Sequence, residues 1–432
     1  MKQLKVGIFG FGTVGSGTIE ILMTNSEIIE KQAGCPITIK KICVKNMGKK
    51  RSFDIDKSML TDKTSDIIED PEIDIVVEVM GGIEEARSII ESSFRKGKHV
   101  VSANKDLISL YGKELSDLAK ENNCHFFYDA AVAGGIPILR SLQFALSGNK
   151  INKIGGIING STNYILTRME VEKLSLEEIV EDAKALGFLE EDPSADLEGL
   201  DAARKCAILA SIGFHSLVTS NQVYVSGINK ITLEDIEYAD SLGYKIKLLA
   251  VAENLDEGIV VRVHPALIEK EHPLASVLYE FNAVYVVGDK VGQTMFYGKG
   301  AGALPTGSSV VNDIISVSKN ILFENKPELA YDFYENKEVL SLKNLSFSYY
   351  MRLLFEHDNN SVSNIIKSLE FYNIPIYSIN QWQKEIDGKQ YDEFVIITNS
   401  CRELNLERAV EEIDMLPNVS LPTRVIRIER GL

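Results

Sequence analysis

The sequence predicts an α/β protein that begins with a doubly wound parallel sheet and continues through about two further domains. The chain has 432 residues, which is too long for a single hydrophobic core. Apolar strand-like runs alternate with amphipathic helical runs near the N-terminus. A different order of strand, helix, two strands, helix and strand begins at residue 348. These observations predict a nucleotide-binding type of sheet first and a small α+β unit last.

Charge and hydropathy exclude several classes of protein. The formal net charge of -16 argues against a nucleic-acid partner, which would select a basic face. No apolar run approaches the roughly 20 residues of a membrane span. The N-terminal run MKQLKVGIFGFG also lacks the long apolar stretch and cleavage site of a signal peptide. We therefore expect a cytoplasmic protein without a membrane partner.

The cysteines and histidines indicate neither disulfides nor a zinc site. The five cysteines are scattered and never form a CxxC pair, and the six histidines lack HxxxH spacing. Cys206 adjoins Lys205 and could be read as a nucleophile. Successive helical residues do not share a face, however, and no histidine lies close in sequence. We favour packing roles for these cysteines.

The first strand leads directly into a dinucleotide fingerprint. An alternating strand is followed by the turn GFGTVG and then by an apolar-periodic helix. Gly10 permits the tight turn, Gly12 lets a pyrophosphate approach the backbone, and Gly15 lets the helix lie close to the strand. The phosphates are expected at the helix N-terminus. The predicted cofactor-binding residues of this turn are Gly10, Phe11, Gly12, Thr13, Val14 and Gly15.

The second strand, ITIKKICV, ends without the acidic residue that would bind an adenosine ribose in an NAD enzyme. Lys45 stands there instead, and Lys49, Lys50 and Arg51 follow it. These side chains could pair with a 2′-phosphate, which favours NADP(H) over NAD(H), or they could form a solvated basic loop. We prefer the first interpretation.

Two more strand and helix units complete the predicted sheet. The run IDIVVEVMGG precedes a helix through Phe94, and KHVVSANKDLIS precedes a helix through Lys120. In a doubly wound sheet the ligand lies at the carboxyl ends of the strands. Gly81 and Lys105 are both expected at that edge, so Lys105 is predicted near a nicotinamide or the substrate.

A charged segment, DPSADLEGLDAARK, lies in the middle of the chain at residues 192–205. The run after Gly199 has helical composition, so Asp201 and Lys205, four residues apart, would share one face. Asp196 would come from the preceding loop. The segment is either a surface ion pair at a helix start or a site that holds charge, and local sequence does not choose between the two.

The segments around this charged run carry a recognisable pattern. The run DAAVAGGIPILRSL predicts a turn opening a helix, and KIGGIINGSTNYIL reads as strand-like with glycines for close approach. Together GFGTVG, SANK, VAGGIPI, INGSTNYIL, LGFLEEDPSADLEGLDAARK and MFYGKGAGALPT occur in the order seen in homoserine dehydrogenases. The resemblance covers essentially the whole chain.

The resemblance implies NAD(P)-dependent interconversion of L-homoserine and L-aspartate 4-semialdehyde. It implies Lys205 as the proton donor and Lys105 as a second catalytic lysine near the nicotinamide. Glu190 and Asp201 would bind the amino-acid substrate, and Asp196 would complete the polar site. An ammonium group favours carboxylates, and an aldehyde accepting hydride develops oxyanion character that favours a cationic donor.

The resemblance also implies a sodium-type cation in the loop represented by Asp129, Val132, Gly134 and Ile136. Backbone carbonyl oxygens suit a hard ion. Asp129 stands where the family commonly has glutamate, one methylene longer. Leu189 stands where the family usually has a small residue; it either narrows the pocket or faces the core, and we prefer the second reading.

The resemblance sets the domain boundaries that we expect. Residues 1–130, with about 305–345 returning to them, form a Rossmann domain in which Gly302 contacts the nicotinamide. Residues 131–304 form an α+β catalytic and dimerisation domain. Residues 348–432 form a ferredoxin-like domain similar to ACT domains. No kinase-length segment precedes Met1, so a fused aspartate kinase is not expected.

ACT domains usually bind their effector through a turn similar to DRPG. Here the turn is His357-Asp358-Asn359-Asn360, without Pro or Gly, although Asn tolerates positive φ. The module therefore either binds threonine or another amino acid or serves only assembly, as part of a homodimer or homotetramer. The rival functions are a dinucleotide-responsive regulatory protein and another NADP-linked reductase of an amino-acid semialdehyde.

Overall fold

A computed structural model describes residues 3–51, 53–185, 189, 191–327, 333–357 and 361–432 of the chain. Its first sheet has six parallel strands in the order β3-β2-β1-β4-β5-β6, which confirms the predicted doubly wound fold. The strands are β1 (Leu4–Phe9), β2 (Ile37–Cys43), β3 (Leu60–Thr61), β4 (Ile75–Glu78), β5 (His99–Ser102) and β6 (Phe126–Phe127).

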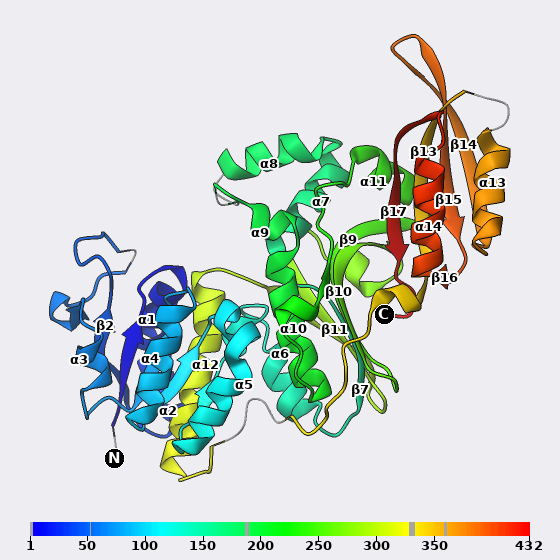
Figure 1. Ribbon diagram of the computed structural model, residues 1–432. Helices are drawn as coiled ribbons and strands as arrows, with labels where there is room; N and C mark the ends of the chain where they lie inside the picture. The colour runs from blue at the N-terminus through cyan, green and yellow to red at the C-terminus, as the bar shows by residue number, and fades with distance from the viewer. Residues whose placement is uncertain (1–2, 52, 186–188, 190, 328–332, 358–360) are drawn as a thin grey trace.

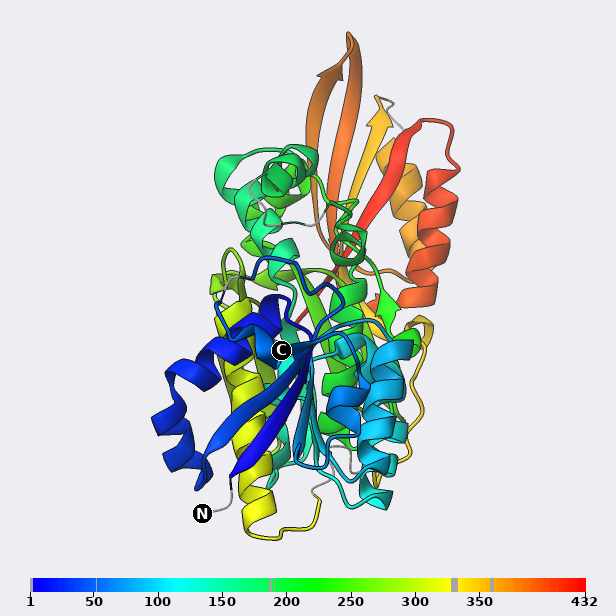
Figure 2. The same cartoon turned by 90° about the vertical axis from the view of Figure 1, so that its left-hand side faces the viewer.

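Helices cover both faces of this sheet (Figures 1 and 2). They are α1 (Thr13–Thr24), α2 (Ser26–Ala33), α3 (Ser65–Ile68), α4 (Glu84–Arg95), α5 (Lys105–Glu121) and the much later α12 (Ala303–Leu322). Strand side chains alternate between the two faces. Val6 and Ile8 pack with Val310 of α12, whereas Phe9 packs with Ile89 and Ile90 of α4.

Glycines bring α12 against α1. A Cβ atom on Gly17 would lie 1.9 Å from the carbonyl oxygen of Ala303, and one on Gly307 would lie 2.6 Å from the carbonyl carbon of Gly17. Neither position accepts a side chain without moving a backbone. Helix α12 therefore joins the first sheet although about 175 residues separate it in sequence from β6.

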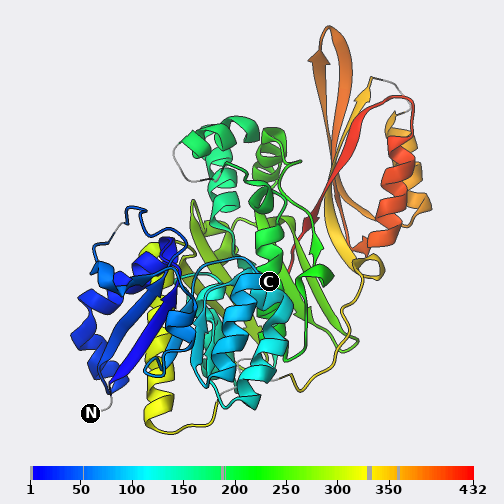
Figure 3. The ribbon, with the colours of Figure 1, turned by 60° about the vertical axis from the view of Figure 1, so that its left-hand side comes forward.

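The middle of the chain forms a sheet with helices on one side (Figure 3), antiparallel except for the parallel pairing of β8 with β10. Its strands are β7 (Ile151–Ile157), β9 (Tyr244–Asn254), β10 (Ile259–Glu269), β11 (Phe281–Gly288), β12 (Gly292–Lys299) and the short β8 (Tyr224–Val225). Its helices are α6 (Ile138–Arg140), α7 (Gly160–Glu172), α8 (Leu176–Ala185), α9 (Ser194–Leu197), α10 (Leu200–Phe214) and α11 (Leu233–Ser241).

The strand-like reading of KIGGIINGSTNYIL is wrong for its second half. The strand β7 ends at Ile157, and α7 begins at Gly160. Asn159 caps this helix because its side-chain oxygen accepts a hydrogen bond from the backbone N–H of Thr162 at 2.8 Å. Gly160 does lie close to another backbone, since a Cβ there would be 2.8 Å from the carbonyl oxygen of Glu280.

The C-terminal unit has the predicted strand, helix, two strands, helix, strand order. Its sheet order is β17-β13-β15-β14, with both helices on one face. The elements are β13 (Ser346–Glu356), α13 (Ser361–Phe371), β14 (Ile376–Ile386), β15 (Lys389–Thr398), β16 (Cys401–Arg402), α14 (Glu403–Asp414) and β17 (Val419–Ile428).

This unit shares its sheet with the middle of the chain. Arg427 and Ile428 of β17 pair in parallel with Ala266 and Leu267 of β10, so one eleven-stranded sheet runs through both parts. Within the described residues, no helix combines the length and apolar character that crossing a membrane requires.

Candidate active site

Asp201 stands between the two lysines that the sequence singled out. Its Oδ1 lies 3.2 Å from Lys105 Nζ, and its Oδ2 lies 2.6 Å from Lys205 Nζ. Lys105 opens α5 directly after β5, at the carboxyl edge of the parallel sheet, and Asp201 lies in the first turn of α10. The site therefore forms where the nucleotide-binding sheet meets the middle part of the chain.

Local geometry fixes each of these side chains. Asp201 and Lys205 share one face of α10, as their spacing of four predicts. Lys205 Nζ also donates to the carbonyl oxygen of Ile158 at 2.9 Å. A second ion pair, Arg204 Nε to Asp106 Oδ1 at 3.0 Å, holds α10 against α5. Lys205 keeps 13% of its side chain exposed, which leaves a narrow approach for a small molecule.

Charge pairing controls ionisation at this site. Burial alone would raise the pKa of Asp201, but Lys205 and Lys105, with hydrogen bonds from Lys205 and Asn159, hold this pKa well below its usual range. Burial alone would lower the pKa of Lys105, but the charge of Asp201 raises it above its ordinary value. Asp201 is thus a carboxylate and Lys105 an ammonium at neutral pH.

Asn159 is a site residue that the sequence analysis missed. Its Nδ2 donates to Asp196 Oδ1 at 2.7 Å and to Asp201 Oδ2 at 2.9 Å, while its Oδ1 caps α7. The expected residue Asp196, in α9, is therefore tied to Asp201. The only local signal in the sequence is an Asn before Gly-Ser-Thr, a pattern typical of helix starts.

The expected substrate residue Glu190 lies outside the described residues. Leu189 is described and is 7% exposed within the hydrophobic core. Its backbone N–H donates to the carbonyl oxygen of Ala183 at 3.3 Å. This burial agrees with the interpretation that Leu189 faces the core.

The fingerprint turn borders a cavity of about 400 Å³ at the carboxyl edge of the parallel sheet. Gly10 has φ +110°, and a Cβ there would lie 2.6 Å from the carbonyl oxygen of Val79. A Cβ on Gly15 would lie 2.3 Å from the carbonyl oxygen of Gly10, whereas one on Gly12 would meet no atom within 4 Å. Gly12 therefore leaves backbone open toward the cavity. Thr13 and Val14 begin α1, whose N-terminus is free to attract phosphate.

Basic residues line the far side of the same cavity. Lys45, Lys49 and Arg51 all contribute to its wall. The Arg51 guanidinium lies 5.3 Å from the centre of the Phe11 ring and donates to the carbonyl oxygens of Phe11 and Asn46. Lys45 is 80% exposed and pairs with Glu85 at 2.8 Å. A phosphate entering here would compete with Glu85 for Lys45.

A buried glutamate organises the turn that contains Gly81. Glu78, fully buried at the end of β4, accepts hydrogen bonds from the N–H groups of Met80 and Gly81 and from the Ser102 hydroxyl. Burial raises the pKa of its carboxyl group. Asn104 Nδ2 donates to the carbonyl oxygen of Gly82 at 2.7 Å. This network positions the residues just before Lys105.

The expected residue Gly302 directly precedes α12 and has φ +119°. Gly300, two residues earlier, is adjacent to the loop of the expected cation site, because a Cβ on Gly134 would lie 2.4 Å from the carbonyl oxygen of Gly300. Ser309 of α12 donates to the carbonyl oxygen of Gly134 at 2.7 Å. The segment after β12 thus closes onto the loop at residues 133–136.

Asp129 supplies the strongest feature of the expected cation site. It is buried, one carboxylate oxygen accepts from the backbone N–H of Arg140, and the other has no hydrogen-bond partner. Burial and the nearby Asp313 raise the pKa of Asp129 to about 7. An unpartnered buried oxygen fits a hard cation. Within the described residues, no group of three His, Cys, Asp or Glu side chains could hold a metal, so any ion here would depend on carbonyl oxygens such as those of Val132 and Ile136.

Three features lie together at the carboxyl ends of the parallel strands: a glycine-rich turn, an open helix N-terminus and a centre of lysines and carboxylates. They define an oxidoreductase that uses a nicotinamide dinucleotide. Comparison with known proteins specifies the family. Residues 10–129 match the family description "Homoserine dehydrogenase, NAD binding domain", and residues 137–315 match "Homoserine dehydrogenase".

The homoserine dehydrogenase of Bacillus subtilis (strain 168) is 42% identical over 430 residues, covering 99% of each chain. A crystal structure of the homoserine dehydrogenase from Thiobacillus denitrificans covers 99% of this chain and 98% of its own, with a TM-score of 0.91 and 37% identity. A hyperthermophilic archaeal homoserine dehydrogenase in complex with NADPH covers 76% of this chain and all of its own, with a TM-score of 0.62 and 28% identity. The chain belongs to the homoserine dehydrogenase family.

Proposed function

We propose that this chain interconverts L-aspartate 4-semialdehyde and L-homoserine, with Lys205 as the proton donor in the reducing direction. The observation that carries this role is the position of Lys205: it is nearly enclosed, oriented by Asp201 and Ile158, and adjacent to the second lysine at the nucleotide-binding edge. Its ammonium can supply a proton where an aldehyde oxygen becomes an alkoxide.

The proposed chemistry uses few groups of this chain. A bound nicotinamide supplies a hydride to the aldehyde carbon. Lys205 Nζ gives a proton to the oxygen that receives the carbonyl electron pair, and solvent then returns a proton to the amine. Lys105 remains charged beside Asp201 and stabilises the developing negative charge. In the oxidising direction Lys205 accepts the proton.

Carboxylates provide the proposed substrate contacts. Asp196 and Asp201, held together by Asn159, offer oxygens to the substrate ammonium. Glu190, which lies outside the described residues, is proposed as a third contact on the family resemblance alone. The carboxylate of Asp201 would thus serve both a lysine pair and the substrate. Other NADP-linked semialdehyde reductases and a non-enzymatic sensor are less well supported, because the family match spans both the nucleotide and the catalytic parts.

The variant Lys205→Ala tests the catalytic assignment. We expect kcat for semialdehyde reduction to fall by at least about 100-fold, the usual contribution of a general acid, while NADPH binding changes little. Lys290→Ala, at the exposed turn between β11 and β12, is the matched control. Turnover like that of the wild type in Lys205→Ala would exclude the assignment.

We infer a preference for NADP(H) over NAD(H). Lys45, Lys49 and Arg51 on the cavity wall support it, as does the NADPH bound to the archaeal relative. A 2′-phosphate is well suited to a guanidinium. The preference predicts that Lys45→Ala weakens NADPH binding and leaves NADH binding unchanged; equal effects on both cofactors would contradict it.

We propose a sodium-type cation at the loop of Asp129, Val132, Gly134 and Ile136. The unpartnered carboxylate oxygen of Asp129 supports it. Sodium should then raise the melting temperature more than the same concentration of a tetraalkylammonium salt, and Asp129→Asn should remove the difference. An equal response of wild type and variant would exclude an ion at Asp129.

We also propose that residues 348–432 are an ACT domain that binds threonine or another amino acid. Residues 131–304 then form the catalytic and dimerisation domain. The whole chain works as a cytoplasmic homodimer or homotetramer. The exposed side chains of Met295 and Tyr297 on the edge strand β12 support association. The five cysteines, all of which the structure describes, form no disulfide with one another, which suits the cytoplasm. A monomeric mass in solution at micromolar concentration would contradict the assembly.

A further inference from the structure

Asn282 is a buried amide near the start of β11 to which the proposed chemistry gives no role. The residue is 2% exposed, and its Oδ1 has no hydrogen-bond partner among the described residues. A buried polar atom without a partner costs stability, and native structures contain few such atoms. Stability therefore does not explain why an asparagine stands at this position.

Asn282 lies on the face of the middle sheet that carries the active site. Strand side chains alternate between faces, and Val284, two residues along β11, belongs to the same hydrophobic core as the apolar residues of α10. The antiparallel pairing of Ala283 with Ile157 brings Asn282 level with Ile158, one step beyond the end of β7. The carbonyl oxygen of Ile158 accepts a hydrogen bond from the proposed proton donor. Asn282 is therefore next to the backbone that orients this donor.

The Asn282 side chain occupies the space that a side chain on Gly300 would take. A Cβ on Gly300 would lie 1.8 Å from Asn282 Nδ2 and 2.2 Å from Asn282 Cγ. Gly300 lies in the loop between β12 and α12 and is followed by Gly302, the expected nicotinamide contact. Asn282 thus sets how closely this loop approaches the sheet.

The same amide lies beside the start of α7. A Cβ on Gly160, the first residue of that helix, would lie 3.5 Å from Asn282 Oδ1. Gly160 directly follows Asn159, which holds the two proposed substrate carboxylates together. One buried side chain therefore stands between the loop expected to meet the nicotinamide and the helix start beside the substrate.

We propose that Asn282 is a positioning residue for hydride transfer. Its side chain holds the loop at Gly300 and the first turn of α7 at the separation that brings the nicotinamide to the aldehyde carbon. Reacting atoms must approach to about 3–3.5 Å, and a displacement of about 1 Å can cost about 100-fold in rate. The proposal rests on the proposed function, because it concerns the same reaction.

The variant Asn282→Ala tests this role by single-turnover kinetics, with enzyme in excess over NADPH and with saturating semialdehyde. We expect the rate of NADPH oxidation to fall by about tenfold to 100-fold, with an isotope effect when C4 of NADPH carries deuterium. The dissociation constant of NADPH and the melting temperature should change little, because Oδ1 loses no hydrogen bond. A purely structural role would lower the melting temperature and leave the single-turnover rate of the folded enzyme unchanged.

A cycle of variants tests the contact with Gly300, because the three atoms nearest to a Cβ there all belong to Asn282. Gly300→Ala alone should lower both the single-turnover rate and the melting temperature, since its methyl group displaces the loop. The same substitution added to Asn282→Ala meets none of those three atoms and should have little further effect.

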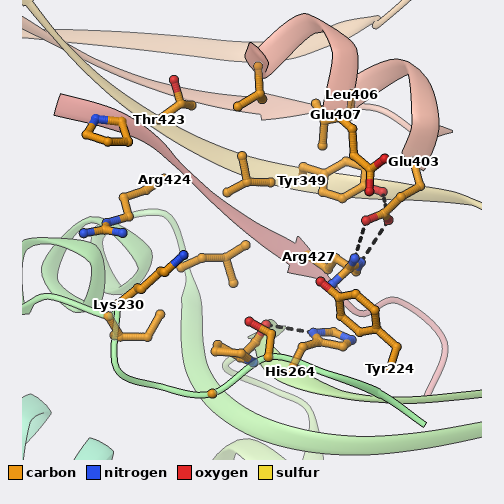
Figure 4. A pocket seen from close by; sticks show the side chains of 18 residues that line it. Tyr224, Lys230, His264, Tyr349, Glu403, Leu406, Glu407, Thr423, Arg424 and Arg427 are labelled. Atoms are coloured by element: carbon orange, nitrogen blue, oxygen red, sulfur yellow. Dashed lines mark hydrogen bonds and ion pairs between the residues drawn. The ribbon is translucent and has the colours of Figure 1, made fainter. Parts of the chain in front are cut away.

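Two controls accompany the cycle. Gly298→Ala lies opposite Asn282 in the β11–β12 pairing, and its Cβ would meet only Ile136 Cγ1, at 3.4 Å. Lys230→Ala lies on the wall of a different cavity, between β17 and the segment after β8 (Figure 4). Both variants should keep the wild-type single-turnover rate.

Three results would overturn the proposal. These are a wild-type single-turnover rate in Asn282→Ala, a fall in rate that saturating NADPH restores, and equal damage by Gly300→Ala in the wild-type and Asn282→Ala backgrounds. Asn282→Ser, judged by the same three results, replaces Asn282→Ala if the latter does not fold. A wild type that fails to reduce the semialdehyde would instead contradict the proposed function, and the melting temperatures of the cycle, which need no turnover, would still test the contact.

Discussion

At the residue scale, one asparagine determines how two carboxylates, Asp196 and Asp201, share the site. Asn159 donates one amide hydrogen to each of Asp196 and Asp201 and uses its oxygen to cap α7. Two carboxylates that accept from the same amide group repel each other, and the hydrogen bonds that this amide donates to both offset the repulsion. Asn159 is therefore a positioning residue, since it acts on the substrate through the two aspartates.

The variant Asn159→Asp separates the two roles of this residue. An aspartate can still cap α7, but it would be a third carboxylate beside Asp196 and Asp201. We expect kcat/KM to fall by about tenfold or more, which corresponds to about 1.4 kcal/mol, with a melting temperature close to that of the wild type. Asn159→Ala, which loses the cap as well, should also cost about 1 kcal/mol of stability. Unchanged kcat/KM in Asn159→Asp would contradict the positioning role.

Lys247 is a buried cation whose titration should be visible in stability. It lies in β9, donates to Asn163 Oδ1 and to the carbonyl oxygen of Val277, and burial lowers its pKa to about 8. The unfolded chain binds this proton up to a pH of about 10.4. Between the two values the unfolded state holds more protons, so stability rises with pH across that window.

We therefore expect the wild type to gain about 3 kcal/mol relative to Lys247→Met between pH 8 and pH 10.4, and no such relative change below pH 7. Urea unfolding of both proteins at several pH values measures this difference. The exposed variant Lys290→Met should follow the wild type. Parallel pH profiles for the wild type and Lys247→Met would disprove the lowered pKa.

At the element scale, α1 and α12 form the packing unit that carries the nucleotide. Both helices begin at the cofactor edge of the sheet, α1 after Gly12 and α12 after Gly302. Gly17 and Gly307 let their backbones touch. A side chain at either position would separate the two helix starts as well as the helices.

The variant Gly307→Ala should thus affect stability and cofactor binding together. Overpacking of this kind costs about 1–3 kcal/mol, and we expect a lower melting temperature with a raised KM for the nicotinamide cofactor. Gly148→Ala is the control, because a Cβ there meets no atom within 4 Å. A loss of stability without any change in KM would mean that the helix starts do not depend on this contact.

The sequence predicted what depends on short-range patterns. The fingerprint turn and the Asp201–Lys205 pair depend on spacings of a few residues, and the structure has both features. The roles of Asn159 and Glu78 depend on partners about 40 and 24 residues away, which spacing does not reveal. Helix α7 was missed because Gly, Ser, Thr and Asn disfavour helix interiors, and capping and burial override that preference.

At the scale of the whole molecule, the C-terminal unit is joined to the middle sheet by a buried ion pair. Arg262 of β10, 1% exposed, donates through Nε and Nη2 to both oxygens of Glu429, just after β17. Leu432 continues this contact, since a Cβ on Gly155 would lie 2.3 Å from its side chain. Neither the ion pair nor the β10–β17 pairing could be read from strand patterns, because pattern fixes a strand and not its partner.

The variant Glu429→Gln should leave Arg262 with one carboxylate partner, Glu253, instead of two. We expect a loss of about 3 kcal/mol and, in urea, unfolding of the C-terminal unit at a lower concentration than the rest of the chain. Glu338→Gln, at an exposed position, should unfold as the wild type does. A single transition at the wild-type midpoint would show that the ion pair does not hold the two parts together.

The late position of α12 in the sequence has a consequence for synthesis on the ribosome. The apolar face formed by Val6 and Ile8 is completed by Val310, Ile314 and Val317. About 175 residues follow β6 before α12 begins, which at 5–20 residues per second corresponds to roughly 10–35 s of translation. During that time the apolar face of the nascent sheet stays exposed to solvent. We therefore expect chaperones to bind the growing chain at this N-terminal region.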